Sequence, residues 1–293
     1  MNLKHFLRLI RVHQWVKNLF VFVPLLFSLH LFNLFYFFQT LSAFIVFCFA
    51  SSAIYVINDI VDIEADRAHP VKKNRPLPSG KISKSTAVFL AVFLLILVSI
   101  SLTYFNYKFI VLAVAFVVLN ILYSFWLKNV VILDIFSIAA GFSIRVLAGA
   151  FAIQVPVSSW LLLTTMFISL FLGVMKRRSE LTLVTENSGM QSRKVLGQYS
   201  LNFTDQMATI AATGVIVCYA LYSVAPRTVS IFNTERLIYT TPFVVFGIFR
   251  FMYLEYISGK GENTTRTLAT DLPMIINFLL YVFATVVIIY KLI

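Results

Sequence analysis

The sequence predicts an all-α, polytopic membrane protein, a bundle of about nine transmembrane helices. Of its 293 residues, 60% are hydrophobic and only 12% are charged, whereas a soluble domain carries about 25% charged residues. Apolar runs recur along the chain, and each is close to the roughly 20 residues that cross about 30 Å of hydrocarbon. They do not alternate apolar and polar residues with a period of two, so a membrane β-barrel is excluded.

The predicted spans are apolar runs separated by short polar or charged segments. The first run, 18–36, is the most irregular, because it contains Pro24 and His30. Before it, residues 1–17 are basic and partly amphipathic, which predicts an interfacial helix lying on an anionic membrane surface. The other eight predicted spans are 40–57, 86–105, 108–126, 130–153, 158–175, 206–225, 237–256 and 272–291.

The charge distribution predicts how the chain is oriented. Its net charge is +12, and most Lys and Arg residues fall in alternate connecting segments. The intervening segments hold only Lys108, Arg227, Arg236 and Lys291. Because cytoplasmic loops are enriched in Lys and Arg, the N-terminus is expected in the cytosol and the C-terminus outside. This arrangement explains the basic charge without nucleic acid as a partner.

The same orientation places the polar loops on the cytosolic face, where function is expected. These loops are 58–84, 176–205 and 257–271. No Ser/Gly-rich linker or low-complexity segment divides the chain, so residues 1–293 are predicted to form one membrane domain.

The acidic residues that follow the second span lie in NDIVDIEADRAHPVKKNRP, residues 58–76. Asn58, Asp62 and Asp66 are spaced i, i+4 and i+8, and Asp59 is close to them, so a continuing helix would place all four on one face. Hard oxygen ligands of this kind suit Mg²⁺ completed by substrate phosphates, and the metal would neutralise a leaving diphosphate. The alternative is a solvated helix end whose acids pair with neighbouring Lys and Arg.

The segment NDIVDIEADR resembles the NDxxDxxxD motif of the UbiA-type intramembrane prenyltransferase superfamily. The resemblance implies a nine-helix bundle that uses Mg²⁺ to bind a diphosphate. A second aspartate-rich motif, usual after the sixth span, is missing here. MKRRSEL stands in its place, with Lys176, Arg177, Arg178 and Glu180. These cations would grip a phosphate, or they form the cytosolic flank of the span.

Four segments resemble one branch of that superfamily, the decaprenyl-phosphate phosphoribosyltransferases: RVHQWVKN, RAHPVKKNRP, YSFWLKN and KRxxEL. That branch transfers 5-phosphoribose from phosphoribosyl diphosphate (PRPP) to a polyprenyl phosphate and releases diphosphate. The resemblance implies a bacterial cytoplasmic membrane enzyme of cell-envelope glycan synthesis. Lys72 and Arg75 would then help the Mg²⁺ site to hold the diphosphate, and Lys176 and Arg177 would hold the 5-phosphate.

Further candidates for substrate binding are polar residues within or beside the spans. Arg145 lies inside the fifth span, where an arginine is costly and therefore a functional candidate; the alternatives are pairing with Asp134 or snorkelling. The remaining candidates lie at span ends or beside them, where basic and aromatic residues are common in any case: Lys17, Tyr123, Lys128 and Asp271.

Two other functions compete with phosphoribosyl transfer. A UbiA-type prenyltransferase would move a polyprenyl group from its diphosphate to an aromatic or other acceptor, but the missing second acidic motif counts against it. A transporter would place its ion site near the membrane midplane, whereas these acids lie at one surface. The sequence leaves open the isoprenoid chain length and whether the protein forms homo-oligomers.

Overall fold

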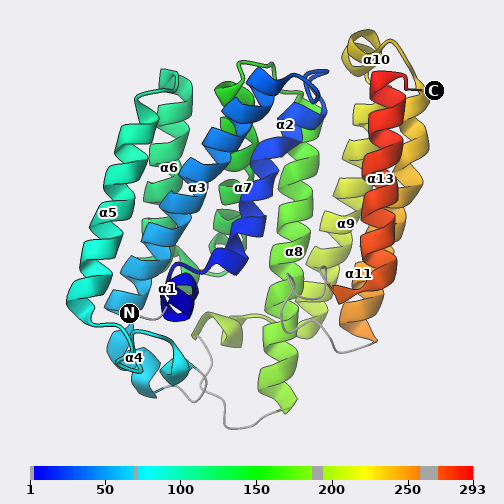
Figure 1. The fold of residues 1–293 in the computed structure, drawn as a ribbon. Coiled ribbons are helices and arrows are strands. Elements are labelled where there is room, and N and C mark those ends of the chain that lie inside the picture. Colours follow the sequence, from blue (N-terminus) through cyan, green and yellow to red (C-terminus); the bar gives the residue numbers. More distant parts are fainter. Residues whose placement is uncertain (1–2, 69–71, 187–193, 258–269, 293) are drawn as a thin grey trace. The chain divides into compact units, whose positions relative to one another are not determined.

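The regular secondary structure is helical throughout the residues that the computed structural model describes, which are 3–68, 72–186, 194–257 and 270–292. The chain forms two compact units (Figure 1). Unit 1 comprises Met1–Phe125 and Ile144–Pro156, and unit 2 comprises Trp126–Ser143 and Val157–Ile293. Helix α7 (Leu133–Ala152) contributes to both units. The predicted all-α membrane fold is confirmed.

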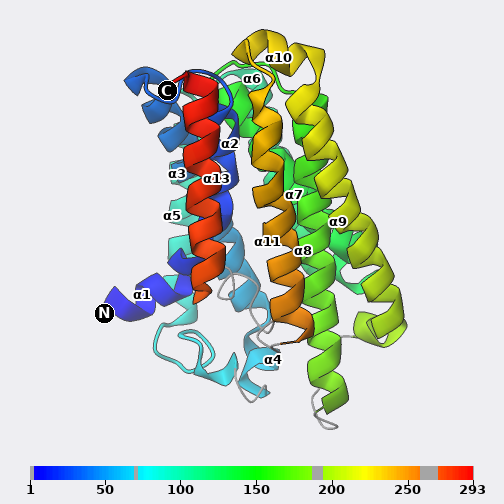
Figure 2. The same ribbon diagram turned by 90° about the vertical axis from the view of Figure 1, so that its right-hand side faces the viewer.

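Unit 1 is organised around the 28-residue helix α3, Leu34–Val61. Helices α5 and α6 pack against it, and so does the N-terminal segment (Figures 1 and 2). Asn33 starts α3, because its side chain accepts a hydrogen bond from the Phe35 N–H at 3.0 Å. The other elements of unit 1 are α1 (Leu3–Leu9), η1 (Val12–Phe22), α2 (Val23–Leu26), α4 (Ile63–Ala68), η2 (Lys72–Asn74), α5 (Lys84–Leu102) and α6 (Tyr107–Phe125).

The first predicted span, 18–36, is wrong in its limits. The helical run lies earlier, from Val12 to Leu26, and most of it is 3₁₀ helix. Leu29 has a left-handed backbone with φ of 63°, which ends the run before α3 begins. At about 2.0 Å per 3₁₀ residue and about 1.5 Å per α residue, this run is about 28 Å long and close to a membrane thickness.

Small residues allow the helices of unit 1 to approach closely. Ala43, Ala50 and Ala53 of α3 are almost completely buried, and small residues are typical of helix contacts in membranes. The tightest approach is at Gly149 of α7, where an added Cβ would lie 2.1 Å from the Val21 carbonyl oxygen. Gly149 therefore fixes the packing of this half of α7 against η1.

Unit 2 is built mainly from long helices that pack in sequence order: α8 against α9, α9 against α11, and α11 against α13. Ser200 caps α9 by accepting from the Phe203 N–H at 3.2 Å. Asp271 caps α13 by accepting from the Met274 N–H at 3.0 Å. The elements of unit 2 besides its half of α7 are η3 (Leu127–Asn129), α8 (Ser159–Glu186), η4 (Lys194–Gln198), α9 (Leu201–Val224), α10 (Pro226–Phe232), η5 (Arg236–Thr240), α11 (Thr241–Tyr256) and α13 (Leu272–Tyr290).

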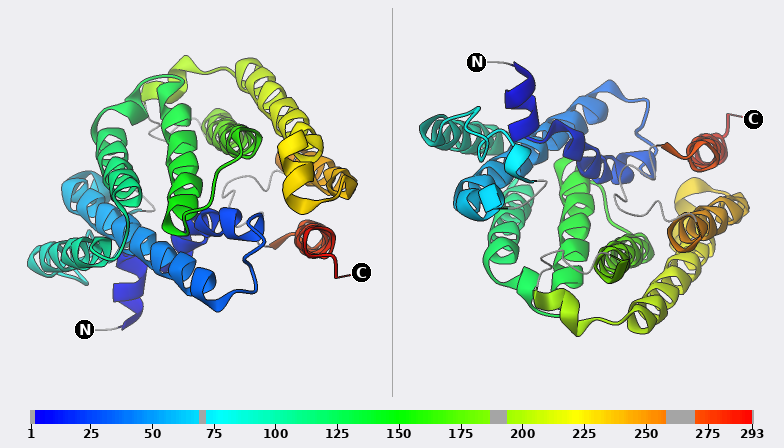
Figure 3. Two further views of the ribbon diagram at one scale, coloured as in Figure 1. Left: turned by 90° about the horizontal axis from the view of Figure 1, so that it is seen from above. Right: turned by 90° about the horizontal axis from the view of Figure 1, so that it is seen from below.

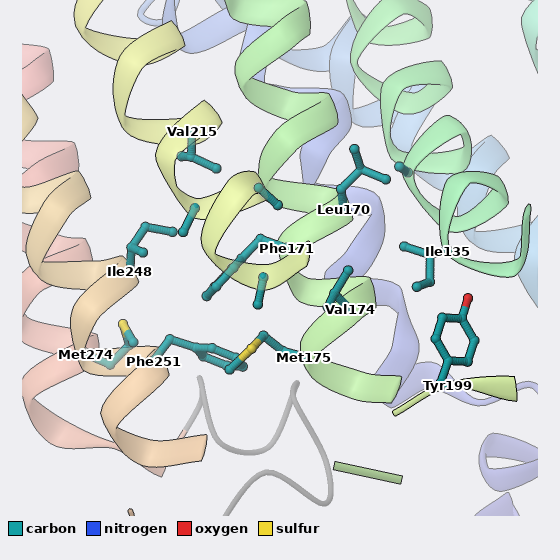
Figure 4. Close-up of a cluster of buried hydrophobic side chains, with 14 of the residues drawn as sticks. Ile135, Leu170, Phe171, Val174, Met175, Tyr199, Val215, Ile248, Phe251 and Met274 are labelled. Carbon is teal, nitrogen blue, oxygen red and sulfur yellow. The ribbon is translucent and has the colours of Figure 1, made fainter. Parts of the chain in front are cut away.

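The core of unit 2 is a cluster of apolar side chains contributed by all of its long helices. Phe171 and Phe251 meet edge to face with ring centroids 5.7 Å apart, an arrangement that aromatic pairs favour. Figure 4 shows these rings with Met175 and Met274 beside them, and Tyr199 beside Ile135 of α7. The cluster joins the four long helices to the start of α7.

Eight helices in the described residues are long and apolar enough to cross a membrane. They match eight of the nine predicted spans. Figure 3 views the same helices from their two ends, where several of them are strongly tilted. The one predicted span without such a helix is the first. It corresponds to the η1–α2 run, which is shorter and less regular than the eight long helices. The cytosolic position of the N-terminus stays a prediction.

We expect Gly149→Ala to destabilise the protein by about 1–3 kcal/mol, a typical cost of overpacking, because the new methyl group would collide with the Val21 carbonyl. The measurement is the thermal unfolding midpoint of the purified protein in detergent. Gly197→Ala is the matched control, since nothing lies within 4 Å of a Cβ there. Equal midpoints for both variants would contradict the close approach of α7 and η1.

Candidate active site

The predicted acidic cluster lies in unit 1, where α3 ends and α4 begins. The predicted continuous helix is interrupted: α3 ends at Val61, and Asp62 is its C-terminal cap, with its N–H donating to the Asn58 carbonyl at 2.9 Å. The Asp66 N–H then donates to the Asp62 carbonyl at 2.8 Å. Asp59 and Asp66 are buried, whereas Asn58 and Asp62 are partly exposed. The four side chains therefore stay close in the chain but differ in environment.

Arginine side chains hold the two buried carboxylates. Arg75 Nη1 lies 3.2 Å from Asp59 Oδ1 and 2.6 Å from Asp66 Oδ2, so it joins α3 to α4. Arg11 Nη2 donates to Asp59 Oδ1 at 2.5 Å, and Lys72 Nζ is 3.8 Å from Asp66 Oδ1. A buried carboxylate without such a partner would be strongly destabilising. Pairing of acids with nearby bases, the alternative that the sequence allowed, is therefore present at Asp59 and Asp66.

The oxygen donors at this helix end fit a Mg²⁺ ion that is completed by phosphate. Asn58 and Asp62 are partly exposed, and the described residues place no basic group in an ion pair with Asp62. Among those residues no three His, Cys, Asp or Glu side chains converge as a preformed metal cage. Mg²⁺ typically uses one or two carboxylates together with waters and substrate phosphates. Asn58 and Asp62 are therefore accessible oxygen ligands, whereas Asp66 is paired with Arg75 and Lys72.

A polar cavity adjoins the acidic cluster within unit 1. Its volume is about 400 Å³. Sequence reasoning identified Asp59 and Arg75 but missed most of the other lining residues, although RVHQWVKN contains three of them. The cavity is lined by Arg8, Arg11, His13, Gln14, Asp59, Asn74, Arg75 and Pro76.

The KRRSEL segment of unit 2 does not present Arg177 to solvent. Its side chain is completely buried, and Nε donates to Asp134 Oδ2 at 2.5 Å while Nη1 donates to Glu180. The Tyr199 hydroxyl donates to Asp134 Oδ1 at 2.7 Å and accepts from the Ile132 N–H at 2.7 Å. Burial and the hydrogen bond to Asp134 raise the pKa of Tyr199, which keeps its hydroxyl protonated as a donor. Arg177 thus holds α8 to the start of α7.

The neighbours of Arg177 differ in exposure. Arg178 Nε donates to Asp205 at 2.6 Å, and its guanidinium lies 3.9 Å from the centre of the Tyr256 ring, so it joins α8 to α9 and α11. Lys176 is exposed. Of the three consecutive cations, Lys176 is the one most accessible to a phosphate.

Arg145 is buried in unit 1, and it does not pair with Asp134 as one alternative from the sequence suggested. Its Nε donates to Asn18 Oδ1 at 2.7 Å, and its guanidinium lies 4.5 Å from the centre of the Phe116 ring. Asn18 also accepts from Ser51 at 3.4 Å. Arg145 therefore holds η1 against α7. Its partner Asn18 directly follows the predicted substrate residue Lys17.

The remaining predicted substrate residues are Asp271, Lys17, Tyr123 and Lys128. Asp271 caps α13 and pairs with Arg250 at 2.8 Å, a structural role that the sequence did not indicate. Lys17 and Tyr123 of unit 1 and Lys128 of unit 2 are all partly exposed. Parts of the predicted catalytic loops, 69–71, 187–193 and 258–269, lie outside the described residues.

Apolar helices of membrane-spanning length, with carboxylates and arginines clustered at their ends, define an integral membrane protein whose polar site lies at helix ends. The model of the UbiA prenyltransferase family matches residues 19–278. The chain belongs to this family, as the NDIVDIEADR motif indicated.

Individual relatives agree with this assignment. The chain is 35% identical over 222 residues to the decaprenyl-phosphate phosphoribosyltransferase of Mycolicibacterium smegmatis. The aligned region covers 74% of this chain and 69% of that protein. The chain is 37% identical over 221 residues to the enzyme of the same name from Corynebacterium glutamicum, covering 74% and 66%. In structure it is similar to a UbiA homologue from Archaeoglobus fulgidus bound to GPP and Mg²⁺, with a TM-score of 0.67, 17% identity, and 98% and 99% of the two chains covered.

The buried network predicts that Arg177→Met destabilises the protein, because it leaves the Asp134 carboxylate buried without its partner. Removing one member of a buried ion pair typically costs about 3–5 kcal/mol. Adding Asp134→Leu should restore most of the thermal unfolding midpoint, since replacing both partners by apolar groups is often neutral. An Arg177→Met protein with an unchanged midpoint that no longer binds PRPP would instead show that Arg177 acts on substrate.

Proposed function

We propose that this protein transfers 5-phosphoribose from PRPP to a polyprenyl phosphate, in the bacterial cytoplasmic membrane and with its site facing the cytosol. The observation that carries the proposal is the cluster of Asp59, Asp66, Lys72 and Arg75 at the polar end of α3, where acids and bases are interleaved. Similarity to two phosphoribosyltransferases supports the same donor and acceptor. The product would serve cell-envelope glycan synthesis.

The donor's diphosphate is assigned to the acidic cluster. Asn58, Asp62 and Asp66 would hold Mg²⁺, which when bound neutralises charge on the departing diphosphate. Lys72 and Arg75 both lie beside Asp66 and are partly exposed, so they can also bind phosphate oxygens, because guanidinium and ammonium groups bind carboxylates and phosphates alike. The acids would thus bind the metal, and the bases would bind the diphosphate that leaves.

The reaction needs alignment and charge stabilisation more than proton transfer. An oxygen of the polyprenyl phosphate forms a bond to the anomeric carbon, while the bond from that carbon to the diphosphate oxygen breaks and diphosphate leaves with the electron pair. The attacking phosphate is already an anion at neutral pH, so no general base is required. Positioning of the two substrates and stabilisation of the leaving group supply the rate.

The direct test is release of diphosphate by the purified protein in detergent. We expect release to require PRPP, a polyprenyl phosphate and Mg²⁺ together, and to stop when the metal is chelated. Prenyl diphosphate with an aromatic acid should give no prenylated product. Turnover of that second pair, without any from PRPP, would establish the prenyltransferase alternative.

Asp62→Ala should reduce turnover by at least 100-fold while the protein keeps its wild-type unfolding midpoint, because Asp62 is a proposed metal ligand on a partly exposed helix cap. Glu64→Ala is the matched control: its side chain is 78% exposed and pairs only with Arg67 among the described residues, so its rate should be unchanged. Near-normal turnover by Asp62→Ala at saturating Mg²⁺ would contradict the assigned metal site.

A further inference from the structure

We infer that the N-terminal cavity of unit 1 binds the ribose 5-phosphate end of the donor, which KRRSEL was expected to bind. This inference rests on the proposed function and assigns a further part of the same substrate. In that segment Arg177 is buried and already paired with Asp134 and Glu180. The cavity offers instead three arginines against one carboxylate: Arg8, Arg11 and Arg75 with Asp59.

The wall of the cavity is held in a fixed shape. Arg11 adopts a left-handed backbone, with φ of 53°, between α1 and η1, which brings Arg8 and Gln14 to one cavity. The Ser52 hydroxyl of α3 anchors this junction by donating to the Ile10 carbonyl at 2.9 Å and accepting from Trp15 Nε1 at 3.0 Å. The site is thus preorganised, which lowers the entropic cost of binding a ligand.

A residue that lines the cavity, Gln14, carries a hydrogen-bond acceptor without a partner among the described residues. Gln14 Oε1 is buried and has no hydrogen-bond partner in the described part of the chain. An unsatisfied buried acceptor costs about 1–3 kcal/mol, so it is favourable for a ligand to satisfy it. A phosphate monoester carries few donors at neutral pH, whereas ribose carries hydroxyl groups. Arginines for a phosphate and an amide acceptor for a hydroxyl together match a phosphorylated sugar.

The lining also argues against the lipid acceptor, whose phosphate has the same chemistry. Seven of the eight lining residues are polar or charged and only Pro76 is apolar, so the cavity suits a phosphorylated sugar better than an isoprenoid tail. Arg75 lines the cavity and also binds Asp66. A donor with its 5-phosphate in the cavity would therefore extend toward the acidic cluster that is assigned to its diphosphate.

The test measures binding of ribose 5-phosphate, inorganic phosphate and a polyprenyl phosphate to the full-length protein in detergent. Arg8→Gln should weaken ribose 5-phosphate binding on the order of tenfold, as loss of a charge-assisted contact does. Gln14→Leu should weaken ribose 5-phosphate binding but leave inorganic phosphate binding unchanged. Lys4→Gln on the same helix is the control, because Lys4 does not line the cavity, and it should bind all three as the wild type does.

Other outcomes would overturn the inference. Wild-type affinity for ribose 5-phosphate in both Arg8→Gln and Gln14→Leu would show that the cavity does not hold the sugar phosphate. A loss confined to polyprenyl phosphate would assign the cavity to the acceptor. PRPP-dependent diphosphate release by the wild-type protein separates these failures from failure of the proposed function, because that activity would persist in either case.

Discussion

The buried aspartates at the ends of the membrane helices are held by arginine partners in both units. An unpaired carboxylate in a low-dielectric environment costs several kcal/mol. Each pair joins segments that are separate in the sequence, so satisfying the charge also fixes the packing. The buried pairs are Asp59 with Arg11 and Arg75, Asp66 with Arg75, and Asp134 with Arg177, and the partly exposed Asp205 and Asp271 pair in the same way with Arg178 and Arg250.

This requirement divides the arginines into two kinds. Arg177 is completely buried with Asp134 and serves the packing of unit 2. Arg8 is exposed at the cavity of unit 1, and Arg75 is partly exposed while it bridges two acids. A guanidinium of the second kind can reach a phosphate from solvent, and Asp59 and Asp66 would still be paired with Arg11 and Lys72 if Arg75 turned toward it. Exposure therefore decides which cations are available to an anionic substrate.

The N-terminal segment links the membrane core to the polar site. Arg145 holds Asn18 in the interior of unit 1, and Gly149 lets α7 approach η1. A few residues earlier, Arg11 reaches Asp59 and lines the cavity. A 3₁₀ helix places its side chains with a period of three rather than 3.6 residues. Its unusual length here therefore affects which side chains of RVHQWVKN face α3.

The sequence by itself determined the membrane class, eight of the nine spans, the acidic motif and the family, because these follow from local composition and spacing. It did not determine the limits of the first span, where an eleven-residue 3₁₀ helix replaces the expected α-helix. Nor did it determine the partners of the charged residues. Arg145 and Asn18 are 127 positions apart, and Arg177 and Asp134 are 43 apart. Only the tertiary structure brings such residues together, because the energy that selects each pair arises from burial of both groups at one place in the fold.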